Sequence, residues 1–211
     1  QVPQAGATPS EALAKRGVAY VELRAVDVNP YSPIGIDHTT AGFLESLALY
    51  CLLKDSPELL DDEQDLIERN QAEVVNRGRA PNAAIMENGE KIAIEDWMNQ
   101  HLSAMNVCAE ALNQAYDTTL YGDALNVMQQ RIDEVDHTLS ARMIEDTLAQ
   151  GGTWNLGSAL AQQHANFYDK HILSTETLTY FDDLAQQSLQ QQDLLEQDQQ
   201  VSFEDYLAQF R

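Results

Sequence analysis

The chain has 211 residues, of which 34 are acidic and 12 are basic, so its formal net charge is −22 at pH 7. Such an acidic surface repels phosphate backbones and anionic lipid, which argues against nucleic acid and membrane surfaces as partners. Hydrophobic residues make up 44% of the sequence, which is typical of a folded protein rather than a disordered one. The only two cysteines, Cys51 and Cys108, are too few for a disulfide framework and favour a cytoplasmic location.

The first 37 residues predict a short helix, a strand and a loop. Ser10 is a candidate N-cap and Gly17 a candidate C-cap of the helix. Residues 18–28 alternate and are rich in β-branched side chains, which predicts a strand. Residues 29–35 contain two prolines and a glycine, so we expect a loop there.

The next elements are two helices and a hairpin. Residues 38–54 are apolar around most of the helix circumference, which predicts a buried helix, whereas residues 61–77 read as a polar surface helix ended by Gly78. Asn88-Gly89 lies between two short apolar-tending runs within residues 83–94. This dipeptide is the strongest local signal for a hairpin, because a type I′ turn needs two positive φ angles.

The remainder of the sequence predicts helices. Apolar residues keep a 3.6-residue period from Ile94 to Tyr116, and Ser174 and Ser202 are candidate N-caps of the last two helices. Further helices are expected at about 120–135, 139–149, 156–171, 175–198 and 203–210. One strand and one hairpin do not make a self-sufficient sheet, so the partner strands come either from another subunit or from a longer protein.

Strand 18–28 carries the strongest candidate for chemistry. With a period of two, Glu22 and Arg24 share one face of the strand. A carboxylate and a guanidinium among apolar residues are costly unless something pairs or ligates them. One reading is an ion pair that covers a sheet. The other is a catalytic face, on which Glu22 binds a divalent cation such as Mg²⁺ and Arg24 binds phosphate or carboxylate.

Other motifs carry weaker signals. The run from Gly152 to Ser158 has the outline of a phosphate loop, but it lacks the lysine and follows a helix, so a turn between helices is expected. The histidines have no metal-ligand spacing and read as surface or packing residues; they are His38, His101, His137, His164 and His171. Both cysteines read as core residues.

The sequence Tyr-x-Glu-x-Arg at residues 20–24 leads into Asn-Pro-x-Ser-Pro-Ile-Gly at residues 29–35. Through this motif, residues 9–37 resemble proteobacterial glutamate–cysteine ligase, also called γ-glutamylcysteine synthetase. The likeness is thinner at residues 78–81 and from 138–142 through 151–153. Members of this family are roughly twice as long, so the resemblance implies that the chain is a C-terminal portion of such an enzyme.

The resemblance also implies a fold class and an activity. The fold would be α+β and predominantly α-helical in this portion, with the strand and the hairpin belonging to a glutamine-synthetase-like antiparallel sheet. Residues 1–37 would contribute a strand and a loop to the catalytic sheet, and residues 38–211 would form a C-terminal helical portion. The enzyme would join L-glutamate to L-cysteine with ATP and Mg²⁺, in the first step of glutathione synthesis.

Carried over residue by residue, the resemblance makes Glu22 a Mg²⁺ ligand and Arg24 the catalytic arginine that meets the transferred phosphoryl group. The other carboxylates that bind Mg²⁺ in the family lie in its N-terminal half, so we expect the isolated chain to be inactive. Two alternatives stay open: a non-catalytic acidic helical module that binds a protein partner, and a small helical protein that completes its sheet by dimerising.

Overall fold

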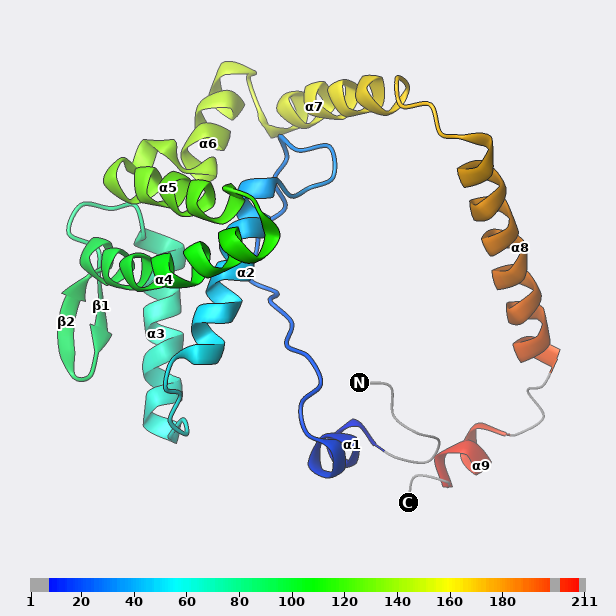
Figure 1. Cartoon of the computed structure of the whole chain (residues 1–211), viewed down its shortest axis with the longest axis horizontal. Helices are drawn as coiled ribbons and strands as arrows, with labels where there is room; N and C mark the ends of the chain where they lie inside the picture. Colours follow the sequence, from blue (N-terminus) through cyan, green and yellow to red (C-terminus); the bar gives the residue numbers. More distant parts are fainter. Residues whose placement is uncertain (1–7, 198–201, 209–211) are drawn as a thin grey trace. The chain divides into compact units, whose positions relative to one another are not determined.

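Figure 1 shows the computed structural model of the chain, which describes residues 8–197 and 202–208. Contacts within the chain define two compact units, Val28–Phe167 and a second one made of Gln1–Asp27 with Tyr168–Arg211. The loop at residues 29–35 thus lies in the larger unit with the helices that follow it. The assignment of residues 1–37 to a catalytic sheet stays a prediction.

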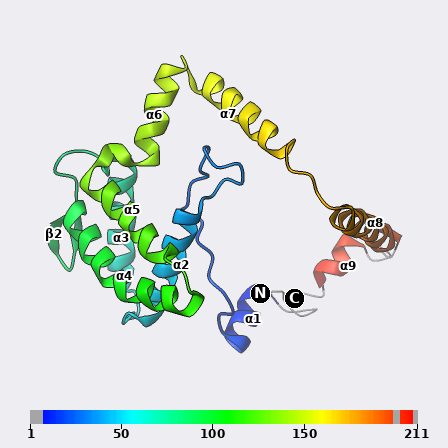
Figure 2. The same cartoon turned by 45° about the horizontal axis from the view of Figure 1, so that its top comes forward.

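The core of the larger unit lies among three helices, α2 (His38–Leu53), α4 (Ile94–Tyr116) and α5 (Leu120–Asp133), which pack against one another (Figures 1 and 2). Its buried members come from α4 and α5, and α2 adds partly buried apolar side chains. The buried residues are Leu102, Met105, Ala109, Tyr121 and Leu125. The 3.6-residue period predicted from Ile94 to Tyr116 is confirmed, because it places these α4 residues on one face.

Helix α2 approaches α5 closely at Gly42. A Cβ atom on Gly42 would meet the Ala124 Cβ at 3.3 Å, which is tighter than an ordinary van der Waals contact, so glycine permits this close approach. One turn later Ser46 is fully buried, and its hydroxyl donates to the Gly42 carbonyl at 2.9 Å. The prediction of a buried helix is only partly correct: one face is packed, whereas Cys51 and Leu52 at its end are exposed.

The predicted hairpin is confirmed. Strands β1 (Ala84–Glu87) and β2 (Glu90–Ala93) pair antiparallel, and Asn88 and Gly89 both have positive φ. Helix α3 (Asp61–Arg77) lies against β1. The Asn70 side chain there accepts from the Met86 amide at 2.9 Å and donates to the Met86 carbonyl at 2.7 Å, so one amide takes the place of a neighbouring strand.

The larger unit continues through the short 3₁₀ helix η1 (Val135–His137) into α6 (Leu139–Ala149) and α7 (Thr153–Tyr168). Gly151 and Gly152 both have positive φ between α6 and α7. Residues 152–158 therefore form the expected turn and helix start rather than a phosphate loop. The sequence predicts this helix at residues 156–171. In the structure it begins earlier, at Thr153, and also ends earlier, at Tyr168.

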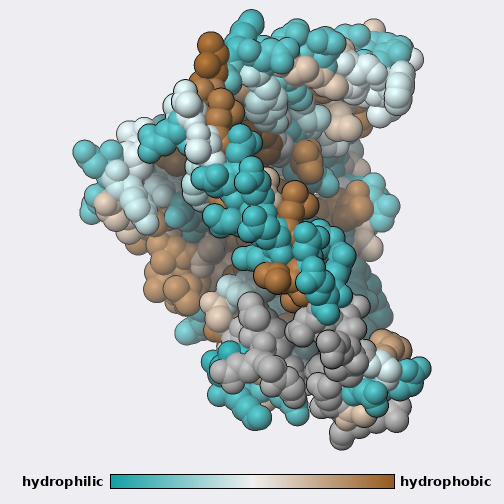
Figure 3. All heavy atoms as spheres, turned by 90° about the vertical axis from the view of Figure 1, so that its right-hand side faces the viewer, coloured by the Kyte–Doolittle hydropathy of each residue, from teal (hydrophilic) through white to brown (hydrophobic). Residues whose placement is uncertain are grey.

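The second unit contains α1 (Pro9–Arg16), the extended segment as far as Asp27, α8 (Thr175–Gln197) and α9 (Phe203–Ala208). Thr8, not Ser10, caps α1, whereas Ser174 and Ser202 cap α8 and α9 as predicted. Apolar side chains of α8, such as Phe181 and Leu195, are exposed, and Figure 3 shows apolar residues among hydrophilic ones at the surface. The predicted helix ends at residues 198 and 209–210 lie outside the described residues.

The strand predicted at residues 18–28 is not observed. In the part of the chain that the structure describes, these residues are extended, are exposed, and pair with no other strand. The physical reason is that a strand obtains its hydrogen bonds from a neighbour, and the two strands of the hairpin pair only with each other.

Candidate functional site

Glu22 and Arg24 lie two residues apart on the extended segment, and their side chains point to the same side. The Arg24 Nη2 donates to the Glu22 Oε2 at 2.8 Å. This contact confirms that the two residues share a face. The side chains are 56% and 82% exposed, respectively. An exposed ion pair contributes at most about 1 kcal/mol to stability, so both groups are available to other ligands.

A carboxylate beside a guanidinium is suited to magnesium and phosphate chemistry, but it does not form a complete metal site. Proteins usually bind Mg²⁺ through one or two carboxylates, with the remaining ligands from phosphates and water. Glu22 fits the part of one such ligand. Nowhere in residues 8–197 and 202–208 do three acidic, histidine or cysteine side chains gather as a metal site. Further protein ligands would have to come from outside this set.

The loop that follows this segment is held by its own hydrogen bonds. The Asn29 amide donates to the Gly35 carbonyl at 2.7 Å, and the Gly35 amide donates to the Ser32 carbonyl at 3.0 Å. Asn29 is only 6% exposed; its side chain accepts from the Tyr31 amide and donates to the Asp37 carboxylate at 2.8 Å. These hydrogen bonds and the two prolines favour the observed conformation of the loop.

Asp37 connects the loop to the start of α2. Its carboxylate accepts from the Thr40 amide at 2.7 Å and caps the helix. Burial works to raise the pKa of Asp37, but the hydrogen bonds from Thr40 and Asn29 and the positive charge of Arg131 outweigh it and lower the pKa. Asp37 is therefore ionised at neutral pH and keeps both contacts.

Two further contacts join the loop to helices far along the chain. The Tyr31 hydroxyl donates to the Asp146 carboxylate of α6 at 2.6 Å, and the Arg142 guanidinium lies 3.6 Å above the Tyr31 ring. On α7, the His164 Nε2 lies 2.9 Å from the Pro30 carbonyl oxygen. The sequence predicts a surface or packing role for His164 and does not indicate the contact of Tyr31 with Asp146, because no local pattern joins residues so far apart.

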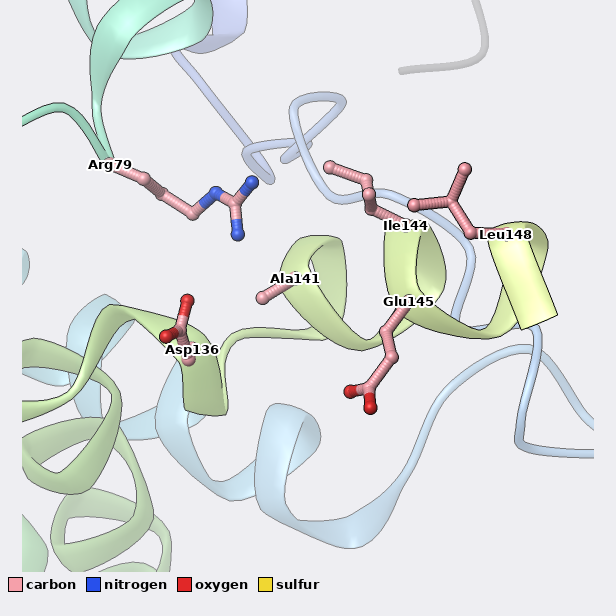
Figure 4. Close-up of a pocket in the computed structure, with 6 residues that line it drawn as sticks. All are labelled: Arg79, Asp136, Ala141, Ile144, Glu145 and Leu148. Carbon is pink, nitrogen blue, oxygen red and sulfur yellow. The ribbon is translucent and has the colours of Figure 1, made fainter.

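A hollow of about 410 Å³ lies where the end of α3 meets η1 and α6 (Figure 4). Its charged lining residues are Arg79, Asp136 and Glu145, and its apolar wall is Ala141, Ile144 and Leu148. In Figure 4 the Arg79 side chain extends over Ala141, and the Glu145 carboxylate turns away from it. The hollow brings together the segments 78–81 and 138–142, which the sequence set apart as similar to the ligase family.

His101 and the two cysteines contact packing residues or are unpaired, and in the described part of the chain they do not form a metal site. His101 lies between Tyr50 and Trp97, with its Nδ1 atom 2.9 Å from the Tyr50 hydroxyl. Cys108 is buried, as predicted, but Cys51 is exposed. Among the described helices, none combines the length and the apolar character needed to span a bilayer.

Comparisons with known proteins connect the whole chain with one family. A family model described as glutamate-cysteine ligase matches residues 1–74. The chain is 32% identical over 212 residues to the glutamate–cysteine ligase of Pseudomonas putida, and 34% identical over 214 residues to that of Shewanella oneidensis. Both alignments cover 100% of this chain and 40% of the relative. The chain thus spans less than half the length of these relatives.

A solved structure of a glutamate–cysteine ligase is also similar to this chain. The chain matches the crystal structure of glutamate–cysteine ligase from Francisella tularensis in complex with AMP, with a TM-score of 0.89 and 25% identity. The match covers 100% of this chain and 41% of that one. The predicted α+β class, predominantly helical with a small antiparallel sheet, agrees with this likeness. Over its whole length the chain is therefore similar to proteobacterial glutamate–cysteine ligases, and it matches the C-terminal 40% of the relatives.

Proposed function

We propose that this chain is part of an ATP-dependent ligase that joins the γ-carboxylate of L-glutamate to the amine of L-cysteine, the first step of glutathione synthesis. The observation that carries the proposal is the likeness over the whole chain to glutamate–cysteine ligases, together with the shared face of Glu22 and Arg24. The reaction would take place in the cytoplasm, which the two unpaired cysteines favour.

The reaction has two steps. The γ-phosphoryl group of ATP passes to the γ-carboxylate oxygen of glutamate, which gives ADP and γ-glutamyl phosphate. The cysteine amine then attacks the acyl carbon, so an amide bond forms, a proton is lost and inorganic phosphate leaves. Phosphoryl transfer depends mostly on positioning and on charge stabilisation, which a carboxylate and an arginine can support.

In this proposal Glu22 is one ligand of Mg²⁺, and Arg24 neutralises charge on the transferred phosphoryl group. Mg²⁺, when bound, supplies positive charge at the phosphate oxygens. The exposure of both side chains supports these roles, because neither is committed to a buried partner in the described structure. The ion pair between them would separate as each group takes its own ligand.

The direct test is an assay of the full natural protein that carries this sequence. The protein is supplied with glutamate, cysteine, ATP and Mg²⁺, and γ-glutamylcysteine and ADP are measured together. We expect Glu22→Gln to lower kcat by about 10²-fold or more, since removal of a group that stabilises transition-state charge has effects of this size. The exposed Glu110 on α4 provides the matched control, because Glu110→Gln makes the same chemical change in the other compact unit of the chain.

Equal activity of the wild type and Glu22→Gln would overturn the proposed role of Glu22. Absence of turnover in the wild-type protein would overturn the proposed function and favour the acidic helical module that binds a partner. Circular dichroism of each variant shows whether it is folded. The 211-residue chain alone should show no turnover, because it spans only 40% of the length of the ligases that it matches.

A further inference from the structure

The loop at residues 29–35 has two kinds of contact, hydrogen bonds within the loop and contacts with distant helices. Its internal hydrogen bonds, between Asn29, Ser32 and Gly35, need no residue outside the loop. The contacts of Tyr31 and Pro30 instead reach residues 115 and 134 positions away along the chain. Contacts of this kind do not determine the loop's conformation; they determine where on the helices the loop lies.

Tyr31, Arg142 and Asp146 each contact the other two residues. The Asp146 carboxylate accepts from the Tyr31 hydroxyl and lies 3.5 Å from the Arg142 Nε atom, while the Arg142 guanidinium stacks on the Tyr31 ring. The stack combines a cation with an aromatic face, which is favourable beyond simple packing. Burial and the hydrogen bond to Asp146 raise the pKa of Tyr31, so its hydroxyl stays protonated and donates.

We infer that Tyr31, Arg142, Asp146 and His164 are positioning residues of the ligase, which hold the loop on α6 and α7. These four residues are here called the loop clamp. The inference rests on the proposed function, because the clamped loop follows the segment of Glu22 and Arg24 directly. Asn29 is five residues after Arg24, so a fully extended chain separates them by at most about 18 Å. A displaced loop would therefore displace the end of the catalytic segment.

The chain offers a matched control for this inference. Tyr121 on α5 donates its hydroxyl to the Glu45 carboxylate of α2 at 2.8 Å, which is the same kind of contact as the 2.6 Å contact of Tyr31 with Asp146. Tyr121 belongs to the helical core, whereas Tyr31 belongs to the loop. Tyr31→Phe and Tyr121→Phe each remove one hydroxyl and leave the ring in place.

The two variants are compared in the full natural protein by steady-state kinetics and thermal unfolding. We expect Tyr31→Phe to lower kcat by about 10-fold, because small displacements of positioned groups have large effects on rate. The KM values should change little, and Tyr121→Phe should lower the midpoint of unfolding without lowering kcat. Asp146→Asn should resemble Tyr31→Phe, and the double variant should lose no more than either single one.

Hydrogen exchange gives a second measurement that does not depend on activity. In Tyr31→Phe, the amides of the non-proline residues between 29 and 36 should exchange faster than in the wild type, while Tyr121→Phe should leave them unchanged. Unchanged exchange and unchanged kcat in Tyr31→Phe would overturn the clamp, as would an equal loss of kcat in Tyr121→Phe. A wild-type protein without ligase activity would instead overturn the proposed function, and faster exchange in Tyr31→Phe would still show that the clamp holds the loop.

Discussion

Residues 18–28 and residues 29–37 follow one another in the chain, yet their surroundings are opposite. Every residue of the first segment is exposed, including Val21 and Val28 at 79% and 76%, and the segment pairs with no strand among the described residues. The second segment contains a buried asparagine, and its Asp37 accepts from the Thr40 amide of α2, while Tyr31 and Pro30 form hydrogen bonds with α6 and α7. A strand depends on a neighbour for its hydrogen bonds, whereas a loop of this kind supplies many of its own.

The largest contrast expected is between the helical core and the exposed segment. Leu125→Ala should lower the free energy of unfolding of the 211-residue chain by about 3 kcal/mol, because Leu125 is 2% exposed and its loss leaves a cavity. Val21→Ala should change it by less than about 0.5 kcal/mol. Urea unfolding followed by circular dichroism measures both values.

The same pair of variants also tests whether residues 18–28 join a sheet. In a protein that contains the partner strands, Val21→Ala should become destabilising, because the side chain would then be buried. If Val21→Ala were already as destabilising as Leu125→Ala in the 211-residue chain, the contrast between the two regions would be wrong.

A smaller effect should separate the loop from the segment before it. Asn29→Ala removes two hydrogen bonds from a buried site and leaves the Tyr31 amide without its acceptor, so a loss of about 1–3 kcal/mol is expected. Asp27→Ala, only two residues earlier but exposed, provides the control and should be nearly neutral. Equal losses in the two variants, measured by urea unfolding, would mean that the loop is not the more structured of the two segments.

The smallest expected effect is a change of stability with pH. It involves His101 of α4, which contacts Tyr50 of α2. Burial, followed by the positive charge of Lys54, lowers the pKa of His101, although Glu87 acts in the opposite direction. A histidine with a lowered pKa in the folded state binds fewer protons than in the unfolded state. Its contribution to stability is therefore complete above about pH 6.5 and declines as the pH falls below that value.

His101→Gln removes this titration. The wild type should lose a few degrees of its unfolding midpoint between pH 7.5 and pH 5.5, and the variant should lose less over the same range. His137→Gln is the control, since His137 is exposed and pairs only with Glu134 in the described structure. A wild type and a His101→Gln variant with the same pH dependence would show that His101 is not responsible.

Much of the helical structure could be predicted because its signals are local. Ser174 and Ser202 start helices through their own hydroxyls, and Asn88-Gly89 makes a turn because of its backbone preferences. The shared face of Glu22 and Arg24 likewise follows from the two-residue period of an extended chain. Each of these features depends on residues close together in the sequence.

Other features could not be predicted, because they depend on contacts between residues that are far apart in the sequence. The apolar character of α2 suggested burial all round, but only the face near Gly42 and Ser46 is fully buried, and the end of the helix is exposed. The contact of Tyr31 with Asp146 joins residues 115 positions apart, and no local pattern indicates it.

Local patterns in the sequence predicted most of the helices, the hairpin turn, the likeness to glutamate–cysteine ligases and the shared face of Glu22 and Arg24, since propensity, capping and motif spacing are properties of neighbouring residues. The tertiary structure was needed to show which face of α2 is buried, that residues 18–28 have no strand partner in the described chain, and that the loop at residues 29–35 contacts α6 and α7. The physical reason is that packing and strand pairing are long-range contacts, whose partners are chosen by the fold as a whole.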